Sequence, residues 1–148
     1  MESKNKPTVD DARLLMDLVK LSSTDRQVKA AQWFFKEFLP KKFTDYVDFR
    51  RQYPMGSEEA GYVGEIMSWY ELAGAMVEHG LLNEDLLFDI AAPPRFFWEP
   101  LKVVIYGQRA EMKEPRIGEN FELLYERAKK WEKNHPPKIK LMAPLKTK

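Results

Sequence analysis

Cysteine is absent from this chain of 148 residues. Its absence excludes disulfides, thiolate metal sites and cysteine nucleophiles, and it favours a reducing compartment over a secreted location. The polar N-terminus, Met1 to Pro7, has no apolar stretch behind it of the kind that a secretory signal needs. We therefore expect a cytoplasmic protein.

Long apolar runs and reactive motifs are also missing. No window approaches the ~18 uninterrupted apolar residues of a membrane-spanning helix, so we expect no transmembrane segment. No serine lies in a nucleophile elbow, and no glycine run resembles a phosphate-binding loop. The two histidines, His79 and His135, have no paired acids in the sequence, which argues against a zinc site or a triad. We expect no metal and no cofactor. The lack of reactive motifs disfavours an enzyme without deciding the question.

The chain has little net charge, because 24 basic residues face 23 acidic ones. The charges are nevertheless unevenly placed. Residues 1–132 hold all 23 acidic residues and 19 of the 24 basic ones, a net charge of −4, and five lysines follow Glu132. An acidic body of this kind would repel nucleic acid, so we expect no nucleic-acid partner.

What is present is the pattern of one helical domain. The length suits a single domain, and apolar residues recur every three or four positions. We predict an all-α, single-domain, antiparallel bundle of about seven helices within residues 1–133, followed by a basic tail over residues 134–148. The predicted helices cover residues 8–21, 24–39, 44–53, 57–79, 83–89, 95–112 and 119–133.

Local signals set the predicted helix ends. Serine, threonine and asparagine at a helix start accept hydrogen bonds from the exposed amides of the first turn, glycine ends a helix, and proline interrupts one. The predicted caps are Thr8, Thr24, Thr44, Ser57 and Asn83, and the predicted stops are Pro40 and Gly80.

The helix predicted over residues 57–79 is apolar around more than half of its circumference, which is typical of a central helix. We expect the helices at 95–113 and 119–133 to be its antiparallel neighbours. Gly61, Gly64 and Gly74 each cost this helix about 1 kcal/mol relative to alanine. Close approach of another helix would compensate that cost.

A set of scattered residues resembles a known family. The residues that carry the resemblance are Tyr70, Glu71, Gly74, Val77, Gly80, Leu81, Leu82, Asp85, Leu86, Phe88, Asp89, Phe97, Trp98, Ile105, Arg109 and Asn120 to Leu124. They are similar to a family of small uncharacterised bacterial helical proteins, a domain of unknown function, over roughly residues 28–131. The resemblance implies the fold and a bacterial origin, and no activity. Members often have an N-terminal membrane helix, which this sequence lacks; that counts against a membrane role.

Three polar residues could form a ligand site. Glu71 and Arg109 each lie at the edge of an apolar helix face, where a carboxylate and a guanidinium could hold a small anion or tune each other for acid–base chemistry. The alternative is a structural ion pair between helices. Gln108 lies inside an apolar stripe and must find hydrogen-bond partners there. A ligand-binding or enzymatic domain using Glu71, Gln108 and Arg109 is therefore the second functional hypothesis.

The first hypothesis is a helical protein-interaction or assembly module. It rests on an abundance of aromatic surface without an assembled reactive site, and its candidate contact face is Tyr62, Trp69 and Leu72. A protein partner or a homo-oligomer would satisfy it.

Two further features stay open. Asp85 and Asp89 share one helix face, and we expect that face to be solvated or to cap the next helix, with Asp89 and Arg95 forming a local pair. The basic tail mixes lysines with apolar residues. It could contact an acidic partner, a membrane surface or nucleic acid, it could dock on its own body or on a second chain, or it could be a free terminus without a function.

Overall fold

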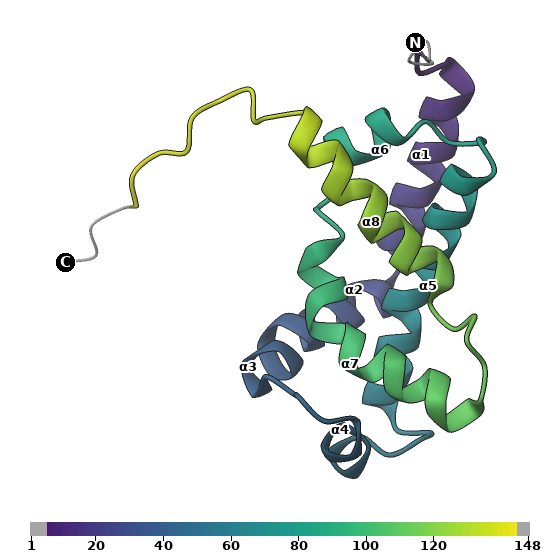
Figure 1. Ribbon diagram of the computed structural model, residues 1–148, viewed down its shortest axis with the longest axis vertical. Coiled ribbons are helices and arrows are strands. Elements are labelled where there is room, and N and C mark those ends of the chain that lie inside the picture. Colours follow the sequence, from purple (N-terminus) through teal and green to yellow (C-terminus); the bar gives the residue numbers. More distant parts are fainter. Residues whose placement is uncertain (1–5, 145–148) are drawn as a thin grey trace.

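Helices make up almost all of the ordered structure in the computed structural model, which describes residues 6–144 (Figure 1). The elements are α1 (Val9–Ser22), α2 (Asp25–Trp33), η1 (Phe34–Phe38), α3 (Leu39–Lys41), α4 (Tyr46–Gln52), α5 (Glu58–Glu78), α6 (Glu84–Ile90), α7 (Arg95–Met112) and α8 (Glu119–Asn134). Because α2, η1 and α3 follow without a break, the described part of the chain has seven continuous helices and no strand. The predicted all-α fold is confirmed.

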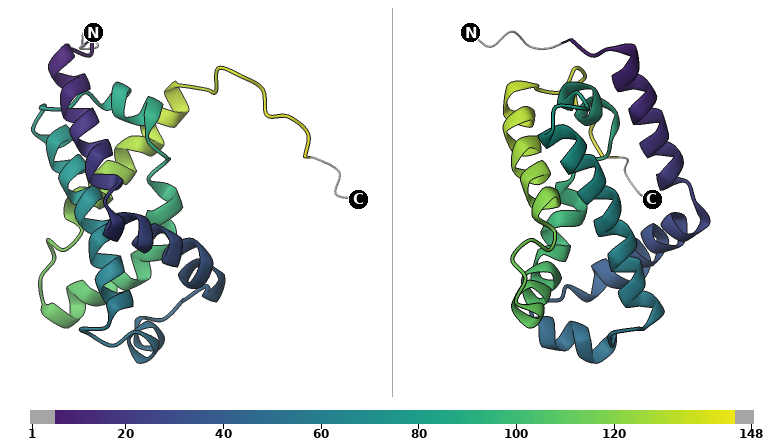
Figure 2. Two further views of the ribbon diagram at one scale, coloured as in Figure 1. Left: turned by 180° about the vertical axis from the view of Figure 1, so that it is seen from behind. Right: turned by 90° about the vertical axis from the view of Figure 1, so that its right-hand side faces the viewer.

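The helix α5 is central, as its sequence predicted. Helices α2 and α8 lie closest to it, and α1 runs beside it in the opposite direction (Figure 2). The indole N–H of Trp69 in α5 donates a hydrogen bond of 2.8 Å to the carbonyl of Leu18 in α1. The buried residues of α5 are Val63, Ile66, Met67, Tyr70, Ala73, Gly74 and Val77.

The direction of α8 differs from the prediction for the neighbours of α5. Tyr70 stacks on Phe121 with ring centroids 4.4 Å apart, and eight residues further along α5 Glu78 accepts a hydrogen bond from Arg127. The contacts therefore advance along both helices together, so α8 runs with α5 rather than against it. The cause is the α7–α8 hairpin: α7 descends against α5, and α8 turns back upward (Figure 1).

Close helix approach explains one of the three glycines of α5. A Cβ atom built on Gly74 would lie 2.3 Å from the backbone oxygen of Asn120 in α8, whereas one on Gly64 would meet nothing within 4 Å. At Gly61 the neighbour is a side chain, the guanidinium of Arg26. The expectation of a packed neighbour therefore holds at Gly74 and fails at Gly64.

Most predicted helix ends are confirmed by hydrogen bonds. The side chains of Thr8, Thr24, Ser57 and Asn83 accept from the backbone amides of their first turns, and Gly80 has a positive φ of 70° just after α5. The prediction for α4 was wrong by one residue. Asp45, not Thr44, accepts the amide hydrogen of Val47, at 2.7 Å.

The predicted stop at Pro40 was also wrong, because the helix continues to Lys41. Proline lacks the amide hydrogen that would bond the carbonyl four residues earlier, and its ring crowds that carbonyl. The turn before it, η1, widens to π-helical geometry, in which the amide of Leu39 bonds the carbonyl of Phe34. This wider turn lets the chain pass Pro40 without a break.

The core is continuous and rich in aromatic rings. Its largest fully buried side chains include Trp98, Phe34, Phe38, Phe49 and Phe121. Within residues 6–144, no buried side chain is polar or charged by residue class. The charged residues singled out in the sequence therefore lie at the margins of the core.

Between residues 6 and 144, no helix combines the length and the apolar character that a membrane crossing needs.

Candidate functional site

Glu71 and Arg109 both bind the turn that leads into α8, and they do not pair with each other. A side-chain oxygen of Glu71 accepts the backbone amide hydrogen of Phe121 at 2.8 Å. Arg109 donates from Nε to the carbonyl of Ile117 at 2.6 Å and lies 2.8 Å from the carboxylate of Glu122. Instead of pairing with each other, Glu71 and Arg109 each bind the start of α8 or the residues just before it.

The reason for this arrangement is the way that α8 begins. Its N-terminal cap is Gly118, which has a positive φ of 69° and no side chain to accept an amide hydrogen. A helix start leaves several backbone amides without partners. Glu71 supplies the missing acceptor from α5, and its negative charge suits the positive end of the α8 dipole.

Replacing Glu71 by alanine should lower the free energy of unfolding by about 1–2 kcal/mol, the usual cost of losing a helix cap. Glutamine at this position keeps an acceptor oxygen and should recover most of the loss. Urea denaturation measures both variants, and Glu119→Ala, at an exposed residue of the same first turn, is the matched control. Equal losses for Glu71→Ala and Glu119→Ala would contradict the capping role.

Gln108 lies apart from the other two candidates. It lines a hollow together with Arg26 and Arg50, near the start of α5, and that hollow contains neither Glu71 nor Arg109. Adjacent residues of a helix point about 100° apart, so the side chains of Gln108 and Arg109 contact different parts of the protein. The structure therefore brings Glu71 and Arg109 to one turn and does not bring Gln108 to them.

The candidate contact face of α5 is partly covered by the chain itself. Trp69 bonds Leu18 as described, and its ring packs edge-on against Tyr70. Tyr62 donates its hydroxyl to Glu58 at 2.8 Å and lies near the ring of Trp33. That hydrogen bond is the main reason that the pKa of Tyr62 is raised. Leu72 is partly buried against the core.

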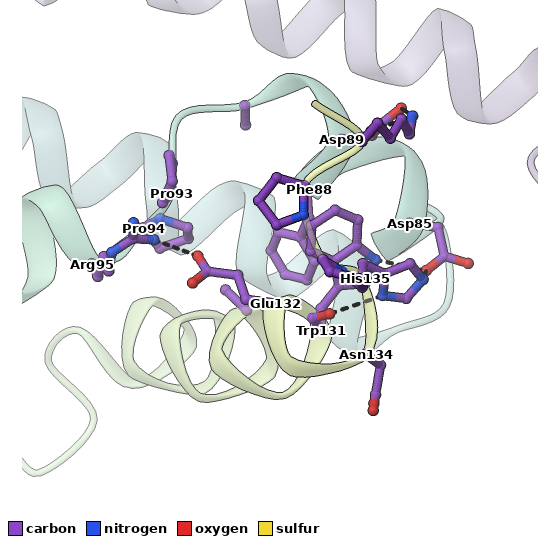
Figure 3. Close-up of a pocket in the computed structure, with 15 residues that line it drawn as sticks. Asp85, Phe88, Asp89, Pro93, Pro94, Arg95, Trp131, Glu132, Asn134 and His135 are labelled. Atoms are coloured by element: carbon purple, nitrogen blue, oxygen red, sulfur yellow. Dashed lines mark hydrogen bonds and ion pairs between the residues drawn. The ribbon is translucent and has the colours of Figure 1, made fainter. Parts of the chain in front are cut away.

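A hollow lies where α6, the loop before α7, the end of α8 and the start of the tail meet (Figure 3). Its volume is about 820 Å³. Aromatic and proline side chains form much of its wall: Phe88, Pro93, Pro94, Trp131, Pro136 and Pro137. No local sequence pattern indicated this hollow, because its wall comes from four separate segments.

The polar residues of this hollow are paired across its elements. The indole N–H of Trp131 donates to Asp85 at 2.9 Å, and the ring of His135 stacks on Trp131 with centroids 4.4 Å apart (Figure 3). The Nε2 atom of His135 lies 3.7 Å from the carboxylate of Asp85. The prediction that His135 has no paired acid was therefore wrong. In the sequence, the spacing of four residues between Trp131 and His135 was the only indication that these two rings could meet on one helix face.

The predicted Asp89–Arg95 pair is not formed either. Asp89 binds the ammonium group of Lys138 in the tail at 3.2 Å, and Arg95 binds Glu132 at the end of α8. Asp85 and Asp89 thus hold the C-terminal region against α6 rather than capping the next helix. Across residues 6–144, no three histidine, aspartate or glutamate side chains gather closely enough to hold a metal ion.

From residue 139 to residue 144 the chain leads away from the body without helix or strand (Figures 1 and 2). The exposed fractions of Ile139, Leu141 and Met142 are 83%, 100% and 86%. No other described large apolar side chain is as exposed as these three. We name Lys138–Met142 the tail segment.

Comparison with known families gives one match. The model of the family described as "Domain of unknown function (DUF4760)" matches residues 7–131, so it covers the helical body and ends before the tail segment. Comparisons with curated proteins and with solved structures find no match. The match covers more than half of the chain and includes the scattered residues of the resemblance. The chain therefore belongs to the DUF4760 family of domains of unknown function.

Proposed function

We propose that this protein is a helical self-assembly module, in which the tail segment of one copy binds the body of a second copy. The observation that carries the proposal is the almost complete exposure of Ile139, Leu141 and Met142. Apolar side chains grouped in water mark an interaction site. In keeping with the absence of cysteine, we place this assembly in the cytoplasm.

The tail segment has the pattern of an extended peptide ligand. Lysine and apolar residues alternate over Lys138-Ile139-Lys140-Leu141, and in an extended chain successive side chains point to opposite sides. Ile139 and Leu141 therefore lie on one side of an extended segment, and Lys138 and Lys140 lie on the other side together with Met142. Such a segment suits a surface that offers an apolar hollow next to acidic groups.

The base of the tail segment is already fixed to the body. Lys138 binds Asp89, and His135, three residues earlier, stacks on Trp131. Pro136 and Pro137 stiffen the chain between these two contacts. A peptide that is held at its base loses less conformational entropy on binding, which favours association.

The hollow near α6 is the receiving surface that we assign. Aromatic and proline side chains form much of its wall, and Ile90 and Phe96, which adjoin the lining residues Asp89 and Arg95 in the sequence, are 61% and 48% exposed. The body that contains it has a net charge of −4, whereas the tail is cationic. Because each copy carries both the segment and the hollow close together, a reciprocal two-fold exchange closes into a dimer.

Light scattering across a concentration series tests the proposal. Wild-type protein should show a dimer mass, and the triple variant Ile139→Ser, Leu141→Ser, Met142→Ser should be monomeric. Each buried apolar side chain contributes about 1.5–3 kcal/mol, so loss of three from each copy should weaken the dimer by at least about a thousandfold. The variant keeps the length and charge of the tail, so only its apolar contacts change.

Two further variants locate the receiving surface. Ile90→Ser with Phe96→Ser should also yield monomers, whereas Met16→Ser with Leu21→Ser, at exposed apolar residues of α1, should leave the dimer intact. A wild-type protein that stays monomeric, or a triple variant that dimerises as well as wild type, would refute the module. Loss of the dimer in the α1 variant alone would move the interface to that helix.

A further inference from the structure

A second hollow of about 600 Å³ lies at the N-terminal end of α5, at the far end of that helix from the tail segment (Figure 1). Polar side chains from α2, α4, α5 and α7 and from the residue before α5 line it, namely Arg26, Arg50, Glu58, Gln108 and Ser57. We propose that this hollow, the arginine hollow, binds the phosphoryl group of a small molecule through Arg26, Arg50 and Gln108. The inference is independent of the assembly proposed above.

Both arginines keep their terminal nitrogens available. Arg26 uses Nε to bind Glu65 at 3.2 Å, and Arg50 uses Nε to bind the hydroxyl of Tyr46 at 2.8 Å. Within residues 6–144, neither guanidinium donates a hydrogen bond from its terminal Nη atoms. The two terminal nitrogens of a guanidinium form the planar fork that binds two oxygens of an anion at once.

The local packing positions these two forks in advance. The side chain of Arg50 is only 19% exposed and lies 5.4 Å from the ring centre of Tyr46. The Arg26 guanidinium lies 5.2 Å from the ring centre of Tyr62. Burial is the main reason that the pKa of Tyr46 is raised, so its hydroxyl stays neutral as an acceptor for Arg50. A binding group that is already oriented pays less entropy when the ligand arrives.

Gln108 and Ser57 add neutral donors to the same hollow. The Gln108 amide makes no hydrogen bond to the described residues, and its polar atoms are not among the buried ones, so they remain open to solvent. The Ser57 oxygen accepts the amide hydrogen of Ala60 at 3.2 Å, which leaves its own hydroxyl hydrogen to donate. The sequence had placed Gln108 in a ligand site with Glu71 and Arg109, whereas the present proposal groups it with Arg26 and Arg50.

The number of donors favours a phosphoryl group over a carboxylate. The two guanidinium forks, the amide of Gln108 and the hydroxyl of Ser57 offer more donors than the two oxygens of a carboxylate accept in simple fork geometry. A phosphoryl group has three or four oxygens at tetrahedral directions. The volume of the hollow also leaves room for the organic part of a small phosphate ester.

One carboxylate in the hollow opposes an anion. Glu58 lines the wall and accepts the hydroxyl hydrogen of Tyr62. Outside the hollow, Glu65 pairs with Arg26, and a carboxylate oxygen of Glu111 lies 3.8 Å from Nε of Arg50. The hollow itself therefore has two cationic side chains against one acidic one, and removal of the Glu58 charge should strengthen anion binding.

Amide NMR at constant ionic strength tests the site with inorganic phosphate as the probe. Phosphate should shift the backbone signals of residues 56–61 and the side-chain NH₂ signals of Gln108. Arg50→Gln should weaken binding by about tenfold or more, the usual effect of losing a charge-assisted hydrogen bond. The matched control is Arg51→Gln, the next residue of α4, which is exposed and pairs with Asp48.

Two variants separate binding from folding. A methyl group at residue 61 would lie 2.5 Å from the present place of the Arg26 terminal nitrogen, a flexible group that can move aside. Gly61→Ala should therefore leave the melting temperature equal or higher, because alanine favours helix, and should still weaken phosphate binding several-fold. Glu58→Gln should strengthen it.

Methyl phosphate and acetate complete the experiment. Tighter binding of methyl phosphate than of inorganic phosphate would identify an esterified phosphoryl group as the ligand, and the reverse order would identify the free ion. Acetate binding as tight as phosphate would overturn the phosphoryl assignment. An absence of phosphate shifts in the wild type, or an equal loss in the Arg50→Gln and Arg51→Gln variants, would overturn the site.

Discussion

Alanine at position 74 should destabilise the protein by about 2–3 kcal/mol, although alanine is the better helix former. Its methyl group would lie 2.3 Å from the oxygen and 2.8 Å from the carbonyl carbon of Asn120, and both are backbone atoms that cannot rotate away. Helix α8 would have to move off α5, and overpacking of this kind costs about 1–3 kcal/mol or more. Urea denaturation of Gly74→Ala gives the number.

The control for this prediction lies on the same helix. Gly64 has open space where its Cβ would be, so Gly64→Ala should raise the free energy of unfolding by about 0.5–1 kcal/mol through helix propensity alone. The two substitutions should therefore act in opposite directions. If both raised stability, the contact between α5 and α8 would be looser than described.

Alanine at position 121 should cost about 3–5 kcal/mol, the usual range for a buried phenylalanine. Phe121 is fully buried, stacks on Tyr70 with centroids 4.4 Å apart and meets Trp98 edge-on at 5.2 Å. It thus joins α5, α7 and α8 at one point. Its loss leaves a cavity that the surrounding rings cannot refill without moving their helices.

Leu123 on the same helix is the control, because it is 41% exposed. Leu123→Ala should cost less than about 1 kcal/mol, since little apolar area returns to water. Thermal unfolding followed by circular dichroism compares the two variants directly. Similar melting temperatures for both would show that the ring cluster around Phe121 contributes little to the fold.

Local sequence signals predicted where the helices lie. They did not predict which helices pack against each other or in which direction. Thr8, Ser57 and Asn83 cap as expected because a cap and its amides lie within four residues of each other. The shared direction of α5 and α8 depends on how α7 crosses the body, which no window of sequence contains. The helix was predicted to end at Pro40, but the wider π-helical turn before it accommodates the missing amide hydrogen of the proline.

Glu71, Gln108 and Arg109 do not form one site, and the sequence contained part of the reason. Neighbouring residues Gln108 and Arg109 point in different directions on any helix, so one hollow rarely holds both. The attachment of Glu71 to the start of α8 was not visible, because it joins residues 50 positions apart. The arginine hollow likewise needs four helices in place before Arg26 and Arg50 line the same hollow.

The glycine at the start of α8 also has a consequence for synthesis on the ribosome. Helix α8 closes its first turn through the amide of Glu122 and the carbonyl of Gly118, but the amide of Phe121 in that turn finds its acceptor in Glu71. As the chain emerges, the Tyr70 side of α5 must therefore wait for a partner that is translated about fifty residues later. During that interval the aromatic side chains on this side of α5 lack their partners from α8, and apolar surface exposed during folding favours aggregation.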